Sequence, residues 1–239
     1  MIMPRAARGL LALLSFLVLL TQAEGQTLGT AEGGGSLPDA PNATAETVNS
    51  GYQRPTEKTK LHNYLFDAFG PYPIVGSAFA AGVNQAYNDP PEWRQGAEGY
   101  GKRFGSHFGI AAISTTSRYT LAEAFHEDTL YYRCECKGLL PRFAHAMLST
   151  LTSRRGDDGH RVFSFASLVS PYVGTFAGTY AWFPDRFGAK DAFRMGNYGL
   201  LYQAAGNVGL EFLYAGPHKW LSRFHLENPN LGPSPGTKQ

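Results

Sequence analysis

The side chains most able to do chemistry gather around His126 and Asp128, in the run His-Glu-Asp. A histidine beside carboxylates can serve general acid–base catalysis or bind a metal ion, because imidazole and carboxylate groups both offer acceptor atoms near neutral pH. Neighbouring residues point in different directions, so catalysis needs a distant partner, and we assign Glu211 to that role. His126, Asp128 and Glu211 would then be catalytic. The alternative is a helix end whose backbone groups these side chains bind.

Glu211 is the only charged side chain in residues 195–216. An ionised carboxylate in so apolar a helix is costly to bury without a partner. We therefore expect Glu211 to face inward and to pair with a basic side chain, first of all Arg133, which can bind both carboxylate oxygens. Asn207, one helical turn earlier, and Tyr131 complete this expected polar cluster. The cluster is either a structural connection or the site of a general base.

Other patterns of metal or cofactor chemistry are missing from the sequence. Apart from His126, the histidines form no His-x-x-x-His or Glu-x-x-His pair, and the two cysteines have no second pair at zinc spacing. There is also no Gly-x-Ser-x-Gly elbow, phosphate-binding loop or dinucleotide fingerprint. We therefore expect neither a metal nor a cofactor.

Residues 1–25 have the three parts of a secretory signal peptide: a basic start, an apolar run at 9–20, and small residues at Ala23 and Gly25. The apolar run is shorter than the roughly 20 residues that span a bilayer, which favours cleavage over an uncleaved anchor. We expect an exported protein of the periplasm or outer membrane. In that oxidising space Cys134 and Cys136 would form a redox-labile disulfide, with free thiols or an intermolecular bridge as alternatives.

The net charge and the composition limit the kinds of binding partner that the sequence supports. The chain has 21 basic and 19 acidic residues, and removal of residues 1–25 takes away two arginines and one glutamate, which leaves 19 and 18. This near-balance gives no case for binding nucleic acid. Only 17% of residues are charged and 28 are glycine, which indicates closely packed helices or contact with a membrane.

The chain divides into the signal peptide, a disordered tether at 26–55, a helical domain at 56–226 and a flexible tail at 227–239. The tether has almost no large apolar side chains, so it cannot offset the entropy lost on ordering. Helical periodicity predicts an all-α compact bundle of closely packed, glycine-rich helices. A membrane-spanning hairpin and an outer-membrane β-barrel are the alternatives.

Small residues recur at helical spacing in two places. Gly101, Gly105 and Gly109 repeat every four residues, and Gly174 and Gly178 repeat the same spacing. Glycine costs a helix about 1 kcal/mol relative to alanine, so such stripes indicate a partner helix at close range. We expect all five glycines to pack against other helices.

A further helix is expected to begin at Pro141, a residue that suits the first helical turn. Its apolar residues follow helical spacing and are expected to form a buried face. They are Phe143, Ala144, Met147, Leu148 and Leu151.

Three segments carry a resemblance to a known family. They are residues 99–103 (Gly-Tyr-Gly-Lys-Arg), the pattern His-x-Asp-x-x-Tyr-Tyr-Arg at 126–133, and Asn-Val-x-x-Glu-Phe at 207–212. With them the chain resembles an uncharacterised family of secreted bacterial proteins of unknown function. The resemblance implies a shared fold and export, and no activity. The run Cys-Glu-Cys at 134–136 departs from the family, where a glycine-rich turn is usual.

Two classes of function remain. The first is a non-catalytic helical module of the bacterial cell envelope that packs against a membrane surface or an envelope protein. The second is an envelope hydrolase or lipid-modifying enzyme that uses His126, Asp128 and Glu211. The sequence leaves the oligomeric state open.

Overall fold

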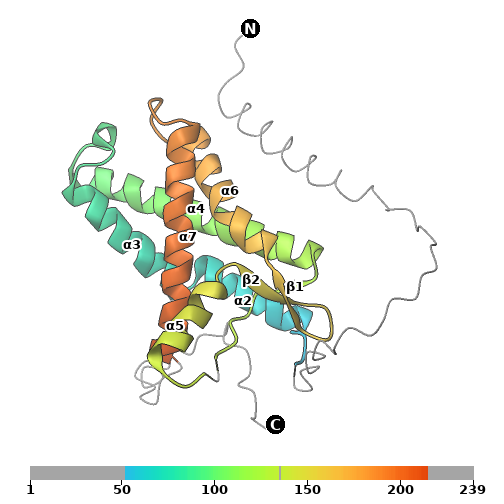
Figure 1. The fold of residues 1–239 in the computed structure, drawn as a ribbon. Coiled ribbons are helices and arrows are strands. Elements are labelled where there is room, and N and C mark those ends of the chain that lie inside the picture. Colours follow the sequence, from blue (N-terminus) through green and yellow to red (C-terminus); the bar gives the residue numbers. More distant parts are fainter. Residues whose placement is uncertain (1–51, 135, 215–239) are drawn as a thin grey trace, which may run out of the picture.

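The computed structural model describes residues 52–134 and 136–214. The predicted signal peptide (1–25), most of the predicted tether (26–55), the end of the predicted helical domain and the predicted tail (227–239) lie outside the described residues. Within the described part the chain is mostly helical, as the sequence predicts (Figure 1). The helices are α2 (Glu57–Phe69), α3 (Pro71–Ala86), α4 (Gly96–Ala124), α5 (Leu139–Leu148), α6 (Phe165–Ala181) and α7 (Ala189–Gly209), with a 3-10 turn η2 (Pro91–Trp93) and a π-helical turn η3 (Leu210–Tyr214).

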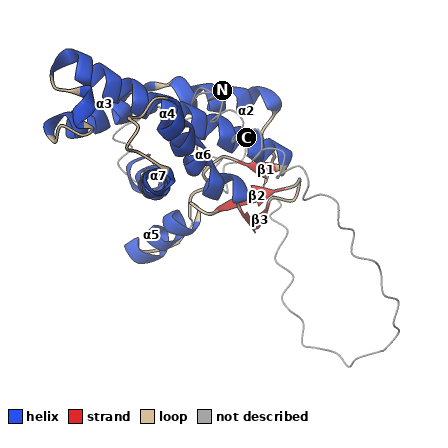
Figure 2. Ribbon diagram, turned by 90° about the horizontal axis from the view of Figure 1, so that it is seen from above, coloured by secondary structure: helices blue, strands red, loops and turns tan. Residues whose placement is uncertain are grey.

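The longest helix, α4, lies at the centre of the packing. Helices α2, α3 and α6 contact it, α7 packs on α6, and α5 packs on α7 (Figures 1 and 2). The interior consists largely of small side chains, since the fully buried apolar residues include Ala68, Ala81, Ala146, Ala166 and Ala192. Many large apolar side chains therefore remain at the surface. None of the described helices combines the length and the hydropathy that crossing a membrane requires.

Local hydrogen bonds fix where the C-terminal helices begin. At the start of α6, Ser164 Oγ accepts a hydrogen bond from Ser167 N at 3.1 Å. At the start of α7, the backbone N of Gly188 donates to Asp191 Oδ2 at 3.1 Å. Such caps supply acceptors for backbone N–H groups at the start of a helix, which have no partner within the helix.

The expectation of an all-α fold was wrong in one region, where a small antiparallel sheet joins the helices. Strand β1 (Glu127–Asp128) pairs with β2 (Thr152–Arg155), and β2 pairs with β3 (His160–Phe163). Gly156 and Gly159 adopt φ values of 70° and 65° in the turn between β2 and β3. Glycine adopts this left-handed conformation without steric cost, so a segment that reads as an exposed loop closes into a hairpin.

The two glycine stripes have different outcomes. Gly174 and Gly178 lie where α6 crosses α4, and a Cβ at Gly174 would stand 2.5 Å from the carbonyl oxygen of Ile110. The prediction for Gly101 and Gly105 was wrong, because no other residue lies within 4 Å of a Cβ built there. Both glycines are exposed, on a face of α4 that none of the described helices covers. A Cβ at Gly109 would only touch Trp182, at 3.5 Å.

Candidate functional site

The predicted catalytic residues occupy three separate places. His126 follows the end of α4 with a left-handed φ of 55° and is exposed to solvent. Its Nδ1 lies 3.4 Å from Nη2 of Arg54. Asp128 and Glu211 are buried in two different polar clusters, and no hydrogen bond among the described residues joins any two of the three. The predicted grouping of His126, Asp128 and Glu211 in one catalytic site is therefore not supported by direct hydrogen bonds among the described residues.

The first cluster surrounds Asp128 at the end of β1. Tyr132 donates a short hydrogen bond to Asp128 Oδ2, and Tyr52 donates to the same oxygen at 3.1 Å. The backbone N of Leu130 donates to Oδ1 at 2.9 Å. The guanidinium of Arg154 lies 4.2 Å from the ring centre of Tyr132, a cation–π contact. Every oxygen of this carboxyl group is therefore bound within the protein.

Burial governs the acid–base behaviour of this cluster. It raises the pKa of Asp128, although the hydrogen bonds from Tyr132 and Tyr52 oppose the change. Burial and the neighbouring Asp128 also raise the pKa of both tyrosines far above that of a free phenol. The phenols therefore keep their protons at neutral pH, as hydrogen-bond donors must.

Tyr52 corrects the predicted boundary of the tether. The tether was expected to extend to residue 55, yet Tyr52 reaches Asp128, and its ring lies 5.8 Å from that of Tyr132, edge to face. A Cβ at Gly159 would overlap the ring of Tyr52, so the glycine makes room for it. The sequence signal for this boundary is an aromatic residue near the end of an otherwise polar segment.

The second cluster holds Glu127, the other carboxylate of β1. Ser164 donates to Glu127 Oε2 at 2.6 Å, and Arg155 donates from Nη2 to Oε1 at 3.0 Å. Ser164 is also the residue that caps α6. Glu127 therefore ties β1 to the start of α6 and to the neighbouring strand, which is a structural role.

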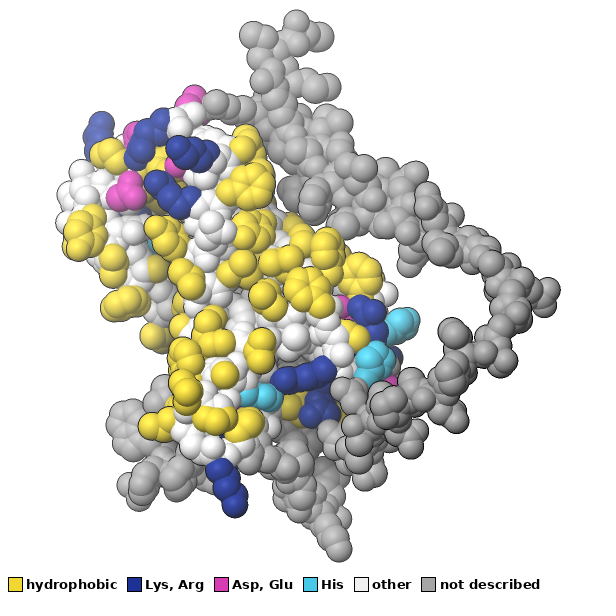
Figure 3. Space-filling model, viewed as in Figure 1, with side chains coloured by type: hydrophobic (Ala, Val, Ile, Leu, Met, Phe, Trp, Pro, Cys, Tyr) yellow, Lys and Arg dark blue, Asp and Glu magenta, His cyan; other side chains and the backbone are white. Residues whose placement is uncertain are grey.

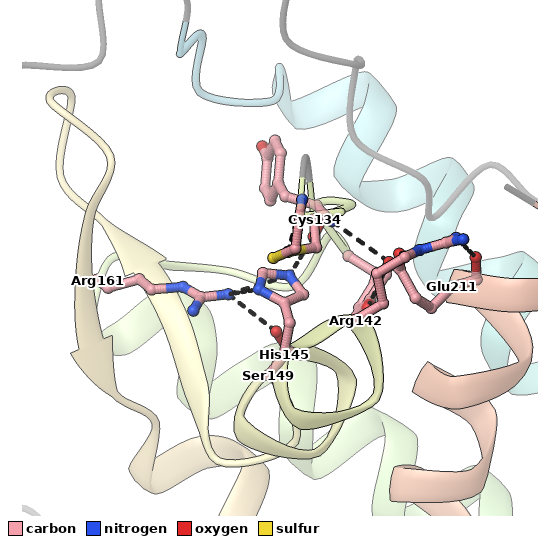
Figure 4. Close-up of a disulfide and its surroundings, with 9 residues drawn as sticks. Cys134, Arg142, His145, Ser149, Arg161 and Glu211 are labelled. Atoms are coloured by element: carbon pink, nitrogen blue, oxygen red, sulfur yellow. Dashed lines mark hydrogen bonds and ion pairs between the residues drawn. A yellow bond between two sulfur atoms is a disulfide. The ribbon is translucent and has the colours of Figure 1, made fainter. Parts of the chain in front are cut away.

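The third cluster holds Glu211, which is 0% exposed, as the sequence predicts for its burial. Its expected partner was wrong, because Arg142 of α5 takes the place assigned to Arg133 (Figure 4). Arg142 Nε donates to Glu211 Oε1 at 2.7 Å, and its Nη2 donates to the Glu211 carbonyl at 2.6 Å. Tyr131 OH and Cys134 N donate to Oε2 at 2.9 and 3.3 Å.

The choice of Arg142 follows from where the helices lie. Helix α5 packs against the end of α7 and η3, which brings Arg142 to the carboxylate and over the ring of Phe212, at 4.8 Å. Arg133 lies elsewhere, and its buried Nε has no hydrogen-bond partner within residues 52–134 and 136–214. Asn207 binds Thr150 Oγ1 at 3.2 Å in place of the carboxylate. A lone arginine in an apolar helix was the signal for Arg142, the same signal that identified Glu211.

The cysteines lie beside this cluster. Cys134 and Cys136 are joined by a disulfide (Figure 4). Cys134 also donates its backbone N–H to Glu211. The disulfide therefore lies in the connection that leads from the buried carboxylate to α5.

A buried arginine that sequence reasoning missed lies near the start of α4. Arg103 is 0% exposed, and all five of its N–H groups donate to oxygen atoms at the end of α3 and in the connection from α3 to α4. A Cβ at Gly99 would stand 2.8 Å from Nη1 of Arg103, so this glycine allows the close approach. The acceptors are Gln85 Oε1, Asn88 Oδ1 and the carbonyls of Asp89, Pro90 and Arg94.

Helix α5 is oriented opposite to the prediction. Its polar residues face the body of the protein, where Arg142 binds Glu211 and His145 Nε2 donates to the carbonyl of Tyr132 at 2.9 Å. Among its residues only Ala146 is buried. Phe143, Ala144, Met147 and Leu148, expected to be buried, are exposed, and Leu151 beyond the helix end is half-buried.

The outer side of α5 is apolar. Leu139 and Leu140 are 75% and 79% exposed, and three further large side chains on the helix are exposed with them. We call this surface the α5 apolar face. It consists of Leu139, Leu140, Phe143, Met147 and Leu148.

The apolar surface continues from α5 along α7. Figure 3 shows hydrophobic side chains running up the front of the molecule from α5 over α7 and onto α6 and α3. On α7 the exposed members include Tyr198, Leu201 and Tyr202. The hydroxyl of Tyr202 would lie 2.6 Å from a Cβ at Gly76 of α3, so these two helices adjoin.

The hollows near the polar clusters offer little room for a substrate. A polar cavity beside Asp128 has a volume of about 50 Å³, enough for one or two water molecules. A hollow of about 220 Å³ between α2 and α4 contains Lys60 and Glu123, which bind each other at 2.7 Å. Neither is lined by His126 or Glu211. The part of the chain that the structure describes holds no group of three His, Cys, Asp or Glu side chains placed to bind a metal ion.

The site therefore consists of buried polar clusters that hold elements together, beside an apolar outer surface. Comparisons with known protein families, with curated proteins and with solved structures give no match.

Proposed function

We propose that the protein is a non-catalytic helical module of the bacterial cell envelope, attached to a membrane or to a partner protein through the α5 apolar face. One observation carries this proposal: α5 turns its polar side inward and its apolar side outward. Helices of globular proteins ordinarily bury the apolar side. An inverted helix that an arginine fixes to a buried carboxylate presents its apolar side for contact with something else.

The energetics favour such a contact. Burying a large aliphatic or aromatic side chain stabilises by about 1.5 to 3 kcal/mol relative to leaving it in water. The five side chains of the α5 apolar face are 40–79% exposed, and exposed apolar side chains of α7 adjoin them. Contiguous exposed apolar surface of this kind is typical of sites that bind proteins or membranes.

Two features favour the envelope as the location. Residues 1–25 have the parts of a signal peptide, and the disulfide between Cys134 and Cys136 suits an oxidising compartment. The envelope location, like the resemblance to secreted bacterial proteins, remains part of the proposal.

The proposal is tested by separating soluble from membrane fractions of cells that export the protein. A variant with Leu139→Ser, Leu140→Ser and Phe143→Ser should move to the soluble fraction, while the wild type stays with the envelope. Leu61→Ser with Leu65→Ser is the matched control, because these α2 residues are also exposed, at 58% and 49%. Equal envelope association of both variants would refute the role of α5.

A further inference from the structure

The α5 apolar face carries no side-chain hydrogen-bonding group. Its members are three leucines, one phenylalanine and one methionine. A protein–protein interface of ordinary size contains about ten hydrogen bonds, and polar groups surround its apolar centre. Lipid chains offer no such partners and require none. The composition of this face therefore suits hydrocarbon better than the surface of another protein.

Among the described residues, a basic side chain is exposed near each end of α5. Lys137 precedes the helix and is exposed, and the exposed Arg161 of β3 donates from Nη2 to Ser149 Oγ at the helix end, at 2.9 Å. The carboxylate that contacts α5, Glu211, is fully buried and bound by Arg142. An approaching surface therefore meets positive charge at both ends of α5, which complements anionic headgroups.

The shape of the molecule also suits a flat surface. Seen from above, α5 projects from the body beyond α7 (Figure 2). A helix of 10 residues is about 15 Å long and can lie flat, with its apolar side roughly 5–10 Å deep at the boundary of headgroups and chains. Tyr198 and Tyr202 of α7 are exposed and have the apolar ring and polar tip that suit this boundary.

Resting on the proposed function, we infer that the partner is an anionic lipid surface, and that α5 inserts into it as a short interfacial helix. The buried pair of Arg142 and Glu211 holds the helix with its apolar face outward. Lys137 and Arg161 lie against the headgroups. In this arrangement α5 binds the membrane at its surface.

Flotation of the processed protein with lipid vesicles tests this inference. Vesicles of phosphatidylglycerol and phosphatidylethanolamine should carry the protein upward, and phosphatidylcholine vesicles should carry much less. Leu140→Ser should weaken binding roughly tenfold, since an inserted leucine contributes on that scale. Lys137→Gln should weaken it about fivefold, and 0.5 M salt should weaken wild-type binding. Leu61→Ser is the control and should bind as the wild type does.

A second readout does not depend on loss of binding. Phe143→Trp should gain fluorescence quenching from bromine-labelled lipid chains, in excess of the wild type. Absence of vesicle binding, or equal binding by wild type and Leu140→Ser, would overturn the inference.

The remaining outcomes separate this inference from the proposed function. Envelope association that depends on α5 without vesicle binding would indicate a protein partner and would overturn the lipid inference alone. A dimer by light scattering that Leu140→Ser dissociates would likewise show that a second copy covers α5. A wild type that binds neither envelopes nor vesicles would overturn the proposed function and the lipid inference together.

Discussion

Replacing Glu211 by glutamine should destabilise the protein strongly, because the substitution removes a buried charge from its partners at almost constant volume. Arg142 is 18% exposed and would keep one neutral acceptor at 2.7 Å. The new amide group would face Tyr131 OH and Cys134 N, two donors that then lose their acceptor. Breaking a buried ion pair costs about 3–5 kcal/mol, and the retained acceptor places Glu211→Gln near 3 kcal/mol.

Thermal unfolding followed by circular dichroism measures this change. At about 2–4 °C per kcal/mol for a domain of this size, the melting temperature should fall by roughly 6–12 °C. Glu98→Gln is the control, since Glu98 forms an exposed pair with Lys102 and its loss should leave the transition unchanged. A transition of Glu211→Gln that coincides with the wild type would refute the claim that this carboxylate holds α5 in place.

The glycines of the helices, the buried Asp128 and the disulfide each allow a further test. Gly174→Ala should destabilise by about 1–3 kcal/mol through overpacking, and Gly105→Ala should stabilise by up to about 1 kcal/mol, both measured by denaturant unfolding. Burial raises the pKa of Asp128 in the folded state, so its contribution to stability should decline as the pH rises above 3.8, and Asp128→Asn should remove that decline from a pH series of unfolding free energies. Thiol counting on denatured, unreduced protein should find no free thiol from Cys134 or Cys136, and two after reduction.

The burial of Glu211 could be predicted, whereas its partner could not. A lone carboxylate in an apolar helix must find a partner inside, and this follows from the cost of burying charge. The sequence favours Arg133 as the partner of Glu211, because Arg133 belongs to the central polar segment. Arg142 is the partner because α5 packs against α7. This packing is a tertiary feature that the local sequence does not specify.

Helical periodicity predicts where helices form, but it does not show which face of a helix packs against the rest of the protein. The mostly helical chain could be predicted, and so could an apolar stripe on the helix that contains Pro141. Such a stripe predicts a buried face, because that is the usual arrangement. The stripe of Gly101 and Gly105 misled in the same way, since spacing alone does not say whether another helix lies opposite. The four-residue strands β2 and β3 were too short to separate from a loop.

Photo-crosslinking from α5 in isolated envelopes tests the central claim most directly. A photoreactive phenylalanine analogue in place of Phe143 reports what touches the α5 apolar face, and the same analogue in place of Leu61 reports on an exposed apolar position of α2. We expect irradiation to give adducts with envelope lipid or protein from position 143 and few from position 61. Equal labelling from both positions, or none from position 143, would contradict attachment through α5.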